Sequence, residues 1–117
     1  MRKILKRFLE CWRLKQYKPM VRFLQKTWVS TQKDGFLSKW LGVRRLLSYN
    51  ILKTDKQSDC MYSVVVWIKS DIMLNSRRVK TIKELVFFNI IKETAPYSPS
   101  INGEWGVNPV LRYKEII

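Results

Sequence analysis

The chain has 117 residues, of which 46% are apolar, and carries a formal net charge of +14 with no histidine. This length suits one domain with a modest core, and the apolar content excludes wholesale disorder. The missing histidine excludes Ser–His and Cys–His catalytic couples and a usual zinc site, and four scattered glycines form no P-loop or dinucleotide fingerprint. We therefore expect no enzyme activity, no metal and no cofactor.

The N-terminal half is predicted to form two or three short basic amphipathic helices. Apolar residues recur at helical spacing over residues 3–17, again after Pro19, and a third time over residues 36–47. Gly42 within the third segment weakens that pattern. A turn cluster, STQKDG at residues 30–35, separates the second segment from the third.

The middle of the chain combines strand and helix signals. A polar loop is expected over residues 54–59, followed by a small β element near 60–69, where the run VVVWI is β-branched and aromatic and predicts a buried strand. Thr81 and Glu84 have the spacing of a capping box, which predicts a helix over 82–93. The apolar run LVFF at 85–88 would equally suit a strand.

The C-terminal residues have the composition of an extended segment. Prolines and glycines are frequent from residue 96 on, and the final run VLRYKEII alternates enough to add a terminal strand. We therefore expect an α+β fold, with a single small basic domain over 1–95 and an extended docking tail over 96–117. The residues expected to dock on a partner are Tyr17, Tyr97 and Trp105.

Positive charge is concentrated in the N-terminal half. Residues 1–56 hold fifteen Lys and Arg against three acids, whereas residues 57–117 hold eight against six. Such asymmetry predicts contact with a polyanion, and Arg favours bidentate contact with phosphate. The candidate nucleic-acid-binding residues are Arg2, Lys3, Lys6, Arg7, Arg13, Lys15, Lys18, Arg22, Lys26, Arg44, Arg45, Arg77, Arg78 and Lys80.

Three functions from different classes fit this pattern. The favoured hypothesis is a non-catalytic, RNA-binding structural subunit of a ribonucleoprotein, most simply a ribosomal protein that contacts rRNA phosphates and neighbouring subunits. The alternative is an accessory subunit of a large mitochondrial membrane complex, with the basic helix against anionic lipid or acidic neighbours. The third is a small DNA-binding regulator with a helix-turn-helix in residues 20–50.

Targeting signals and cysteines add three expectations. No apolar run approaches the roughly 18–20 residues of a spanning helix, so we expect no transmembrane segment. Residues 2–18 partly fit an uncleaved mitochondrial import signal, which favours an organellar matrix over the cytoplasm. The two cysteines, Cys11 and Cys60, are expected as reduced, buried thiols because two are too few for a disulfide framework.

Overall fold

A computed structural model describes the backbone of residues 1–31, 43–94 and 98–115 and the side chains as far as residue 108. Its helices are α1 (Arg2–Arg13), α2 (Tyr17–Met20), the 3-10 turn η1 (Val21–Phe23) and α3 (Lys26–Ser30). Its strands are β1 (Arg44–Ser58), β2 (Met61–Leu74), β3 (Arg77–Thr94), β4 (Ser98–Pro99) and β5 (Glu104–Glu115).

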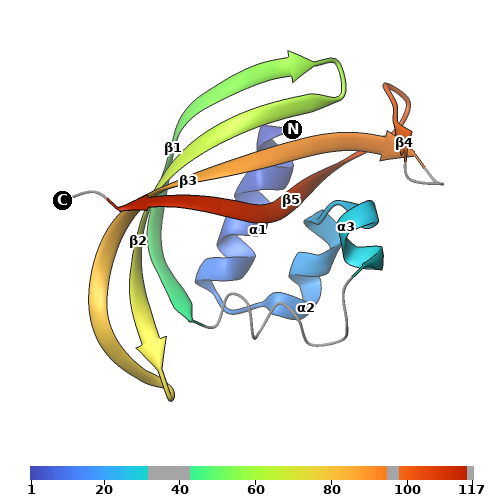
Figure 1. Cartoon of the computed structure of the whole chain (residues 1–117). Coiled ribbons are helices and arrows are strands. Elements are labelled where there is room, and N and C mark those ends of the chain that lie inside the picture. Colours follow the sequence, from blue (N-terminus) through green and yellow to red (C-terminus); the bar gives the residue numbers. More distant parts are fainter. Residues whose placement is uncertain (32–42, 95–97, 116–117) are drawn as a thin grey trace.

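The strands form one antiparallel sheet that dominates the molecule. Strand β2 lies between β1 and β3, and the other edge of β3 pairs with β4 and β5. The sheet is strongly bent, and α1 lies against its concave side, with α2 and α3 beside it (Figure 1). We call the concave side the helix face and the opposite side the outer face.

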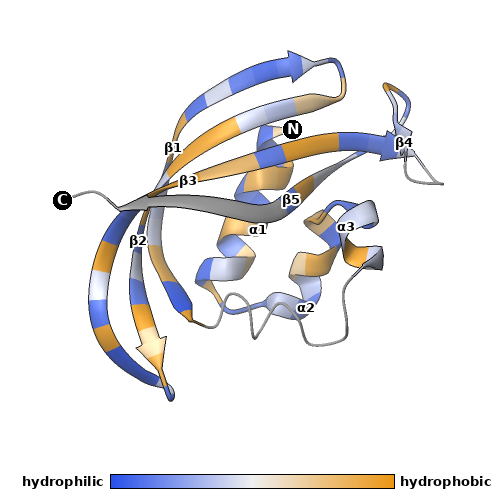
Figure 2. Ribbon diagram, viewed as in Figure 1, coloured by the Kyte–Doolittle hydropathy of each residue, from blue (hydrophilic) through white to orange (hydrophobic). Residues whose placement is uncertain are grey.

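The core lies between α1 and the helix face. Helix α1 buries five side chains on one stripe, among them Phe8 and Trp12, which confirms its predicted amphipathic character. Phe8 meets Phe88 of β3 edge-on, with ring centroids 5.6 Å apart. Apolar residues recur along the strands that face the helices (Figure 2). Helix α1 ends before the expected residue 17, because Lys15 adopts a left-handed φ of 57°.

The fold-class prediction is wrong in its main point, because residues 82–93 form part of strand β3 and not a helix. Every second residue from Glu84 to Ile90 is buried, which is the period of a strand with one face on the core. The Thr81 hydroxyl donates to Asp71 across the ladder at 2.5 Å and caps nothing. Cross-strand burial of β-branched and aromatic side chains therefore outweighs the local capping signal.

Four further elements differ from expectation for the same reason, since residues with weak local preference join long strands. The expected loop 54–59 lies mostly inside β1, and the small β element near 60–69 is part of a strand that continues to Leu74. The expected third helix overlaps β1 at residues 44–47, and its residues 36–42 lie outside the described residues. The terminal strand expected from VLRYKEII is confirmed as β5, but this strand begins earlier, at Glu104, and pairs with β3, so that most of the expected extended tail belongs to the sheet. The domain division at residue 95 stays a prediction.

The β2–β3 connection is a tight two-residue turn that extends a hairpin beyond the helices. Leu74 pairs with Arg77, and the two turn residues Asn75 and Ser76 have φ values of 52° and 62°. Positive φ at both positions matches the right-handed twist of a hairpin. We call residues 69–83 the hairpin arm; its turn lies at the lower left of Figure 1.

Strand β1 forms an irregular edge. Its pairing with β2 skips three residues, Leu47, Leu52 and Gln57. Bulges of this kind bend a strand and increase its local twist, and they protect an edge from pairing with other chains. The bulges thus help to curve the sheet around α1. Cys11 is buried and Cys60 half-buried, and both are free thiols.

Candidate nucleic-acid interface

The acidic side chains of this basic chain are nearly all occupied inside the molecule. Five of the seven that the structure describes pair with a cation, at distances between 2.8 and 3.4 Å. The other two, Asp71 and Glu93, accept hydrogen bonds from neutral donors. Few internal counter-ions are therefore left for the other cations.

Most described cations have no acidic partner within the described residues. They lie on the surface, with Lys69 and Lys92 half-buried and the remainder exposed. The set comprises Arg2, Lys3, Lys6, Arg7, Lys15, Lys18, Arg22, Arg45, Lys69, Arg77, Arg78, Lys80, Lys83 and Lys92. Uncompensated charge of this density repels itself and favours association with an anion.

The first group of these cations covers the solvent side of α1. Arg2, Lys3, Lys6 and Arg7 are exposed because the opposite stripe of the helix is buried against the sheet. The Arg7 guanidinium lies 5.9 Å from the centroid of the Phe23 ring, a cation–π contact that links α1 to η1. The structure therefore brings together the four predicted residues of this helix face.

The second group lies where the corner between α1 and α2, the start of β1 and the hairpin arm come together. The indole of Trp12, near the end of α1, donates to the Arg44 carbonyl at 3.0 Å, which fixes the start of β1 beside the helix. In the strand register, Arg45 pairs with Asp71 at the base of the arm. The positive charge of Arg45 is close enough to Tyr17 to oppose the rise in the pKa of its hydroxyl. These elements lie at one end of the molecule in Figure 1.

We call this second group the basic edge. Its members are exposed and come from positions far apart in the sequence: Lys15 and Lys18 from the corner, Arg45 from β1, and Arg77, Arg78 and Lys80 from the arm. The sequence pattern predicts that the arm cations precede a helix N-terminus. The structure instead puts them on β3 at the end of the β2–β3 hairpin, whose last residues extend past the start of β1 at Arg44.

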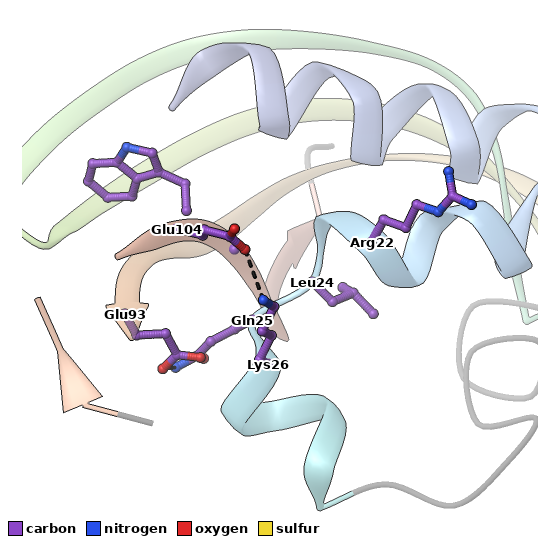
Figure 3. A pocket seen from close by; sticks show the side chains of 8 residues that line it. Arg22, Leu24, Gln25, Lys26, Glu93 and Glu104 are labelled. Carbon is purple, nitrogen blue, oxygen red and sulfur yellow. Dashed lines mark hydrogen bonds and ion pairs between the residues drawn. The ribbon is translucent and has the colours of Figure 1, made fainter. Parts of the chain in front are cut away.

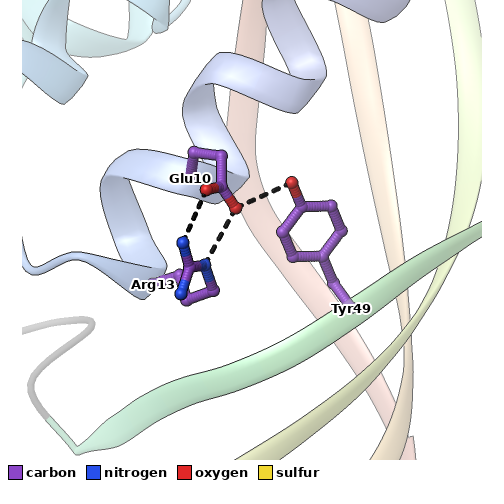
Figure 4. A network of polar contacts seen from close by, with 3 residues as sticks. All are labelled: Glu10, Arg13 and Tyr49. Atoms are coloured by element: carbon purple, nitrogen blue, oxygen red, sulfur yellow. Dashed lines mark hydrogen bonds and ion pairs between the residues drawn. The ribbon is translucent and has the colours of Figure 1, made fainter.

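Arg13 belongs to an internal network and is less available than predicted. Its guanidinium forms two bonds to Glu10, at 2.9 and 2.8 Å, and the hydroxyl of Tyr49 donates to the same carboxylate at 2.9 Å (Figure 4). The hydrogen bond from Arg13, then that from Tyr49, lowers the pKa of Glu10. Burial and this bond raise the pKa of Tyr49.

Arg44 also has an internal partner. Its Nε lies 2.9 Å from Glu84 Oε1, and the Glu84 side chain is only 4% exposed. A buried carboxylate needs such a partner, because an isolated ion is strongly disfavoured in the interior. We therefore assign Arg44 a structural role in place of the predicted nucleic-acid contact.

Lys26 and Arg22 line a small pocket between the helices and the edge of the sheet (Figure 3). Lys26 pairs with Glu104 at 2.9 Å across its mouth. The pocket volume of about 20 Å³ has room for about one water molecule and none for a substrate.

Glu93 at this pocket fastens α3 to the sheet. It accepts from the Thr27 amide at 2.9 Å, the Thr27 hydroxyl at 2.6 Å and the Gln25 amide at 3.1 Å. Burial raises the pKa of Glu93, but the bonds from Thr27 and Gln25 outweigh it, so that the pKa is lowered. The carboxylate is thus held ionised at the start of α3.

The residues predicted to dock on partners have different positions. Tyr17 is half-buried, and burial raises its pKa while the charge of Arg45 opposes this. Trp105 packs against Tyr62, with ring centroids 5.5 Å apart, and lies under Lys92. Tyr97 lies outside the described residues.

Searches for metal sites, membrane helices and relatives give no positive finding. In the described ranges, no group of three or more Cys, Asp or Glu lies close enough to hold a metal ion, and no helix there is long and apolar enough to span a bilayer. Comparisons with protein-family models, curated proteins and solved structures give no match. A function for this chain is therefore inferred from its own geometry and charge.

Proposed function

We propose that this protein is a non-catalytic structural subunit of a ribonucleoprotein, and that its basic edge and the solvent side of α1 contact RNA phosphates. One observation carries the proposal: the described acidic side chains are bound within the molecule, while most described cations have no acidic partner. A phosphate backbone would replace the mutual repulsion of these cations by attraction. The ribonucleoprotein that we propose is a ribosome, either cytoplasmic or of an organelle such as the mitochondrion.

The shape of the surface supports the same proposal. Arg77, Arg78 and Lys80 are exposed at the end of the hairpin arm, where the phosphates of a folded RNA can approach them. Lys15 and Lys18 extend the positive surface from the base of the arm to the helices.

The direct test is binding to a structured RNA across a salt series. If the six cations of the basic edge and the four of α1 each neutralise one phosphate, log K falls with log salt with a slope of about −9. The double variant Arg77→Glu/Arg78→Glu should weaken binding at least tenfold and reduce the slope by about 2. Far-UV circular dichroism should remain unchanged, because both side chains are exposed at the turn.

The matched control is Lys56→Glu. Lys56 is exposed near the β1–β2 turn, at the far end of the sheet from the arm, and it already pairs with Asp59. This change should leave RNA affinity within about twofold. A flat salt slope, equal losses for the arm variant and the control, or binding to anionic vesicles without RNA binding would refute the proposal. Tighter binding to duplex DNA than to RNA would favour a DNA-binding protein instead.

A further inference from the structure

The outer face of the sheet carries an apolar block that no described element covers. Val65 and Trp67 of β2 lie directly opposite Phe87 and Leu85 of β3, and all four side chains are half-buried. Strand alternation points these residues away from α1, because their neighbours Val64, Val66, Val86 and Phe88 are buried on the helix face. The run VVVWI predicts a buried strand from its composition and gives no sign of this surface.

Cations and amides border the block. At one end, Lys69 lies directly opposite Lys83, an arrangement of like charges that destabilises a sheet unless an anion joins them. Neither lysine side chain has a hydrogen bond or an ion pair within the described residues. At the other end, the Ser63 hydroxyl donates to Asn89 at 3.1 Å.

The two aromatic rings of the block differ from those of the core. Phe8 contacts both Trp12 and Phe88, and Trp105 is packed by Tyr62. Trp67 and Phe87 have no ring or cation partner among the described residues, although they occupy diagonal positions on adjacent strands. Two unpartnered rings on a basic sheet form a surface on which successive bases can stack.

We propose that this outer face binds an unpaired RNA segment, with bases stacked on Trp67 and Phe87 and the backbone phosphates held by Lys69 and Lys83. This inference rests on the proposed function and identifies the substrate class of a second surface: single-stranded rather than folded RNA. A second copy of this chain fits poorly, because a two-fold contact through the face would bring its own lysines together.

The test measures the binding of single-residue variants to two ligands, an oligouridylate of eight nucleotides and an RNA duplex of twelve base pairs. Trp67→Leu keeps an apolar side chain but removes the ring, and should weaken oligouridylate binding about tenfold while duplex affinity changes by less than twofold. Trp67→Phe keeps a ring and should retain most of the affinity. Ile101→Ala removes an exposed apolar side chain in the β4–β5 connection, outside both the block and the basic edge, and should change neither affinity.

Lys83→Gln provides a test that does not depend on the tryptophan variant folding, because the Lys83 side chain is exposed. It should weaken oligouridylate binding about threefold at low salt, and the loss should shrink as salt is added. Equal affinity of Trp67→Leu and Trp67→Phe, or an unchanged affinity of Lys83→Gln, would overturn the inference. So would self-association or poly-glutamate binding that Trp67→Leu abolishes, since the face would then bind protein. A failure of the proposed function would give a different result: the unaltered protein would show no salt-dependent binding to the RNA duplex.

Discussion

Replacing Arg44 by methionine should destabilise the fold without removing an RNA contact. Methionine keeps an unbranched apolar stem that ends where the guanidinium begins, and it leaves the backbone carbonyl that accepts from Trp12. The substitution removes the 2.9 Å contact to Glu84, whose side chain is 4% exposed, while that of Arg44 is 29% exposed. A buried carboxylate is then left without its cation.

Breaking a buried ion pair by removing one partner typically costs about 3–5 kcal/mol. The partial exposure of Arg44 lets solvent screen the pair, so we expect a smaller loss of about 2–3 kcal/mol. For a domain of this size, such a loss corresponds to a decrease in Tm of roughly 10 °C. It is a large part of the roughly 5–15 kcal/mol by which domains are stable.

Urea unfolding of Arg44→Met, Glu84→Leu and the double variant completes a double-mutant cycle. The double variant should lie within about 1 kcal/mol of the unaltered protein, because removing both charges leaves no unpaired ion in the core. The salt slope of RNA binding by the folded Arg44→Met variant should not change. A loss below about 0.5 kcal/mol, or independent effects of the two single changes, would refute the assigned role of the pair.

Two further changes test other parts of the fold. Glu93→Gln should cost about 1–2 kcal/mol near neutral pH, because it weakens charge-assisted bonds from Thr27. The folded pKa of Glu93 is lowered, so its contribution is complete above the unfolded value of 4.5 and is lost as pH falls through the folded pKa. The difference in unfolding free energy between the two proteins should therefore be constant above about pH 5 and shrink in acid; a constant difference at all pH values would contradict this. Ser76→Gly should stabilise the protein by about 0.5–1 kcal/mol in urea unfolding, because Ser76 has a left-handed φ of 62° after Asn75; a loss of stability would show that the turn is not strained.

The N-terminal helix illustrates what local sequence can predict well. The stripe that includes Phe8, Cys11 and Trp12 has helical spacing, and these residues are the buried side of α1. Helix periodicity is a property of near neighbours, so it can be read without knowing what the helix packs against. The end of α1 could not be read in this way, because Lys15 carries no signal for its left-handed conformation.

Residues 82–93 illustrate the opposite case. Thr81 and Glu84 have the spacing of a helix cap, yet their partners are Asp71 and Arg44, which are distant in sequence. Contacts between distant residues also decide which cations are available to a ligand. Arg44 and Lys26 belong to internal ion pairs. Lys69 and Lys83, which are absent from the predicted set, border the outer face. No property of the isolated residues separates these two groups.

The sequence by itself determined the cation surplus, the lack of histidine chemistry and the amphipathic first helix, because composition and short-range periodicity are independent of the fold. Only the tertiary structure decided which charges are neutralised, which aromatic rings are buried and which lie on the outer face. Strand pairing brings together residues that are 10 to 40 positions apart in these cases, and a strand presents each of its faces to a different environment. Those environments depend on contacts that local sequence does not encode.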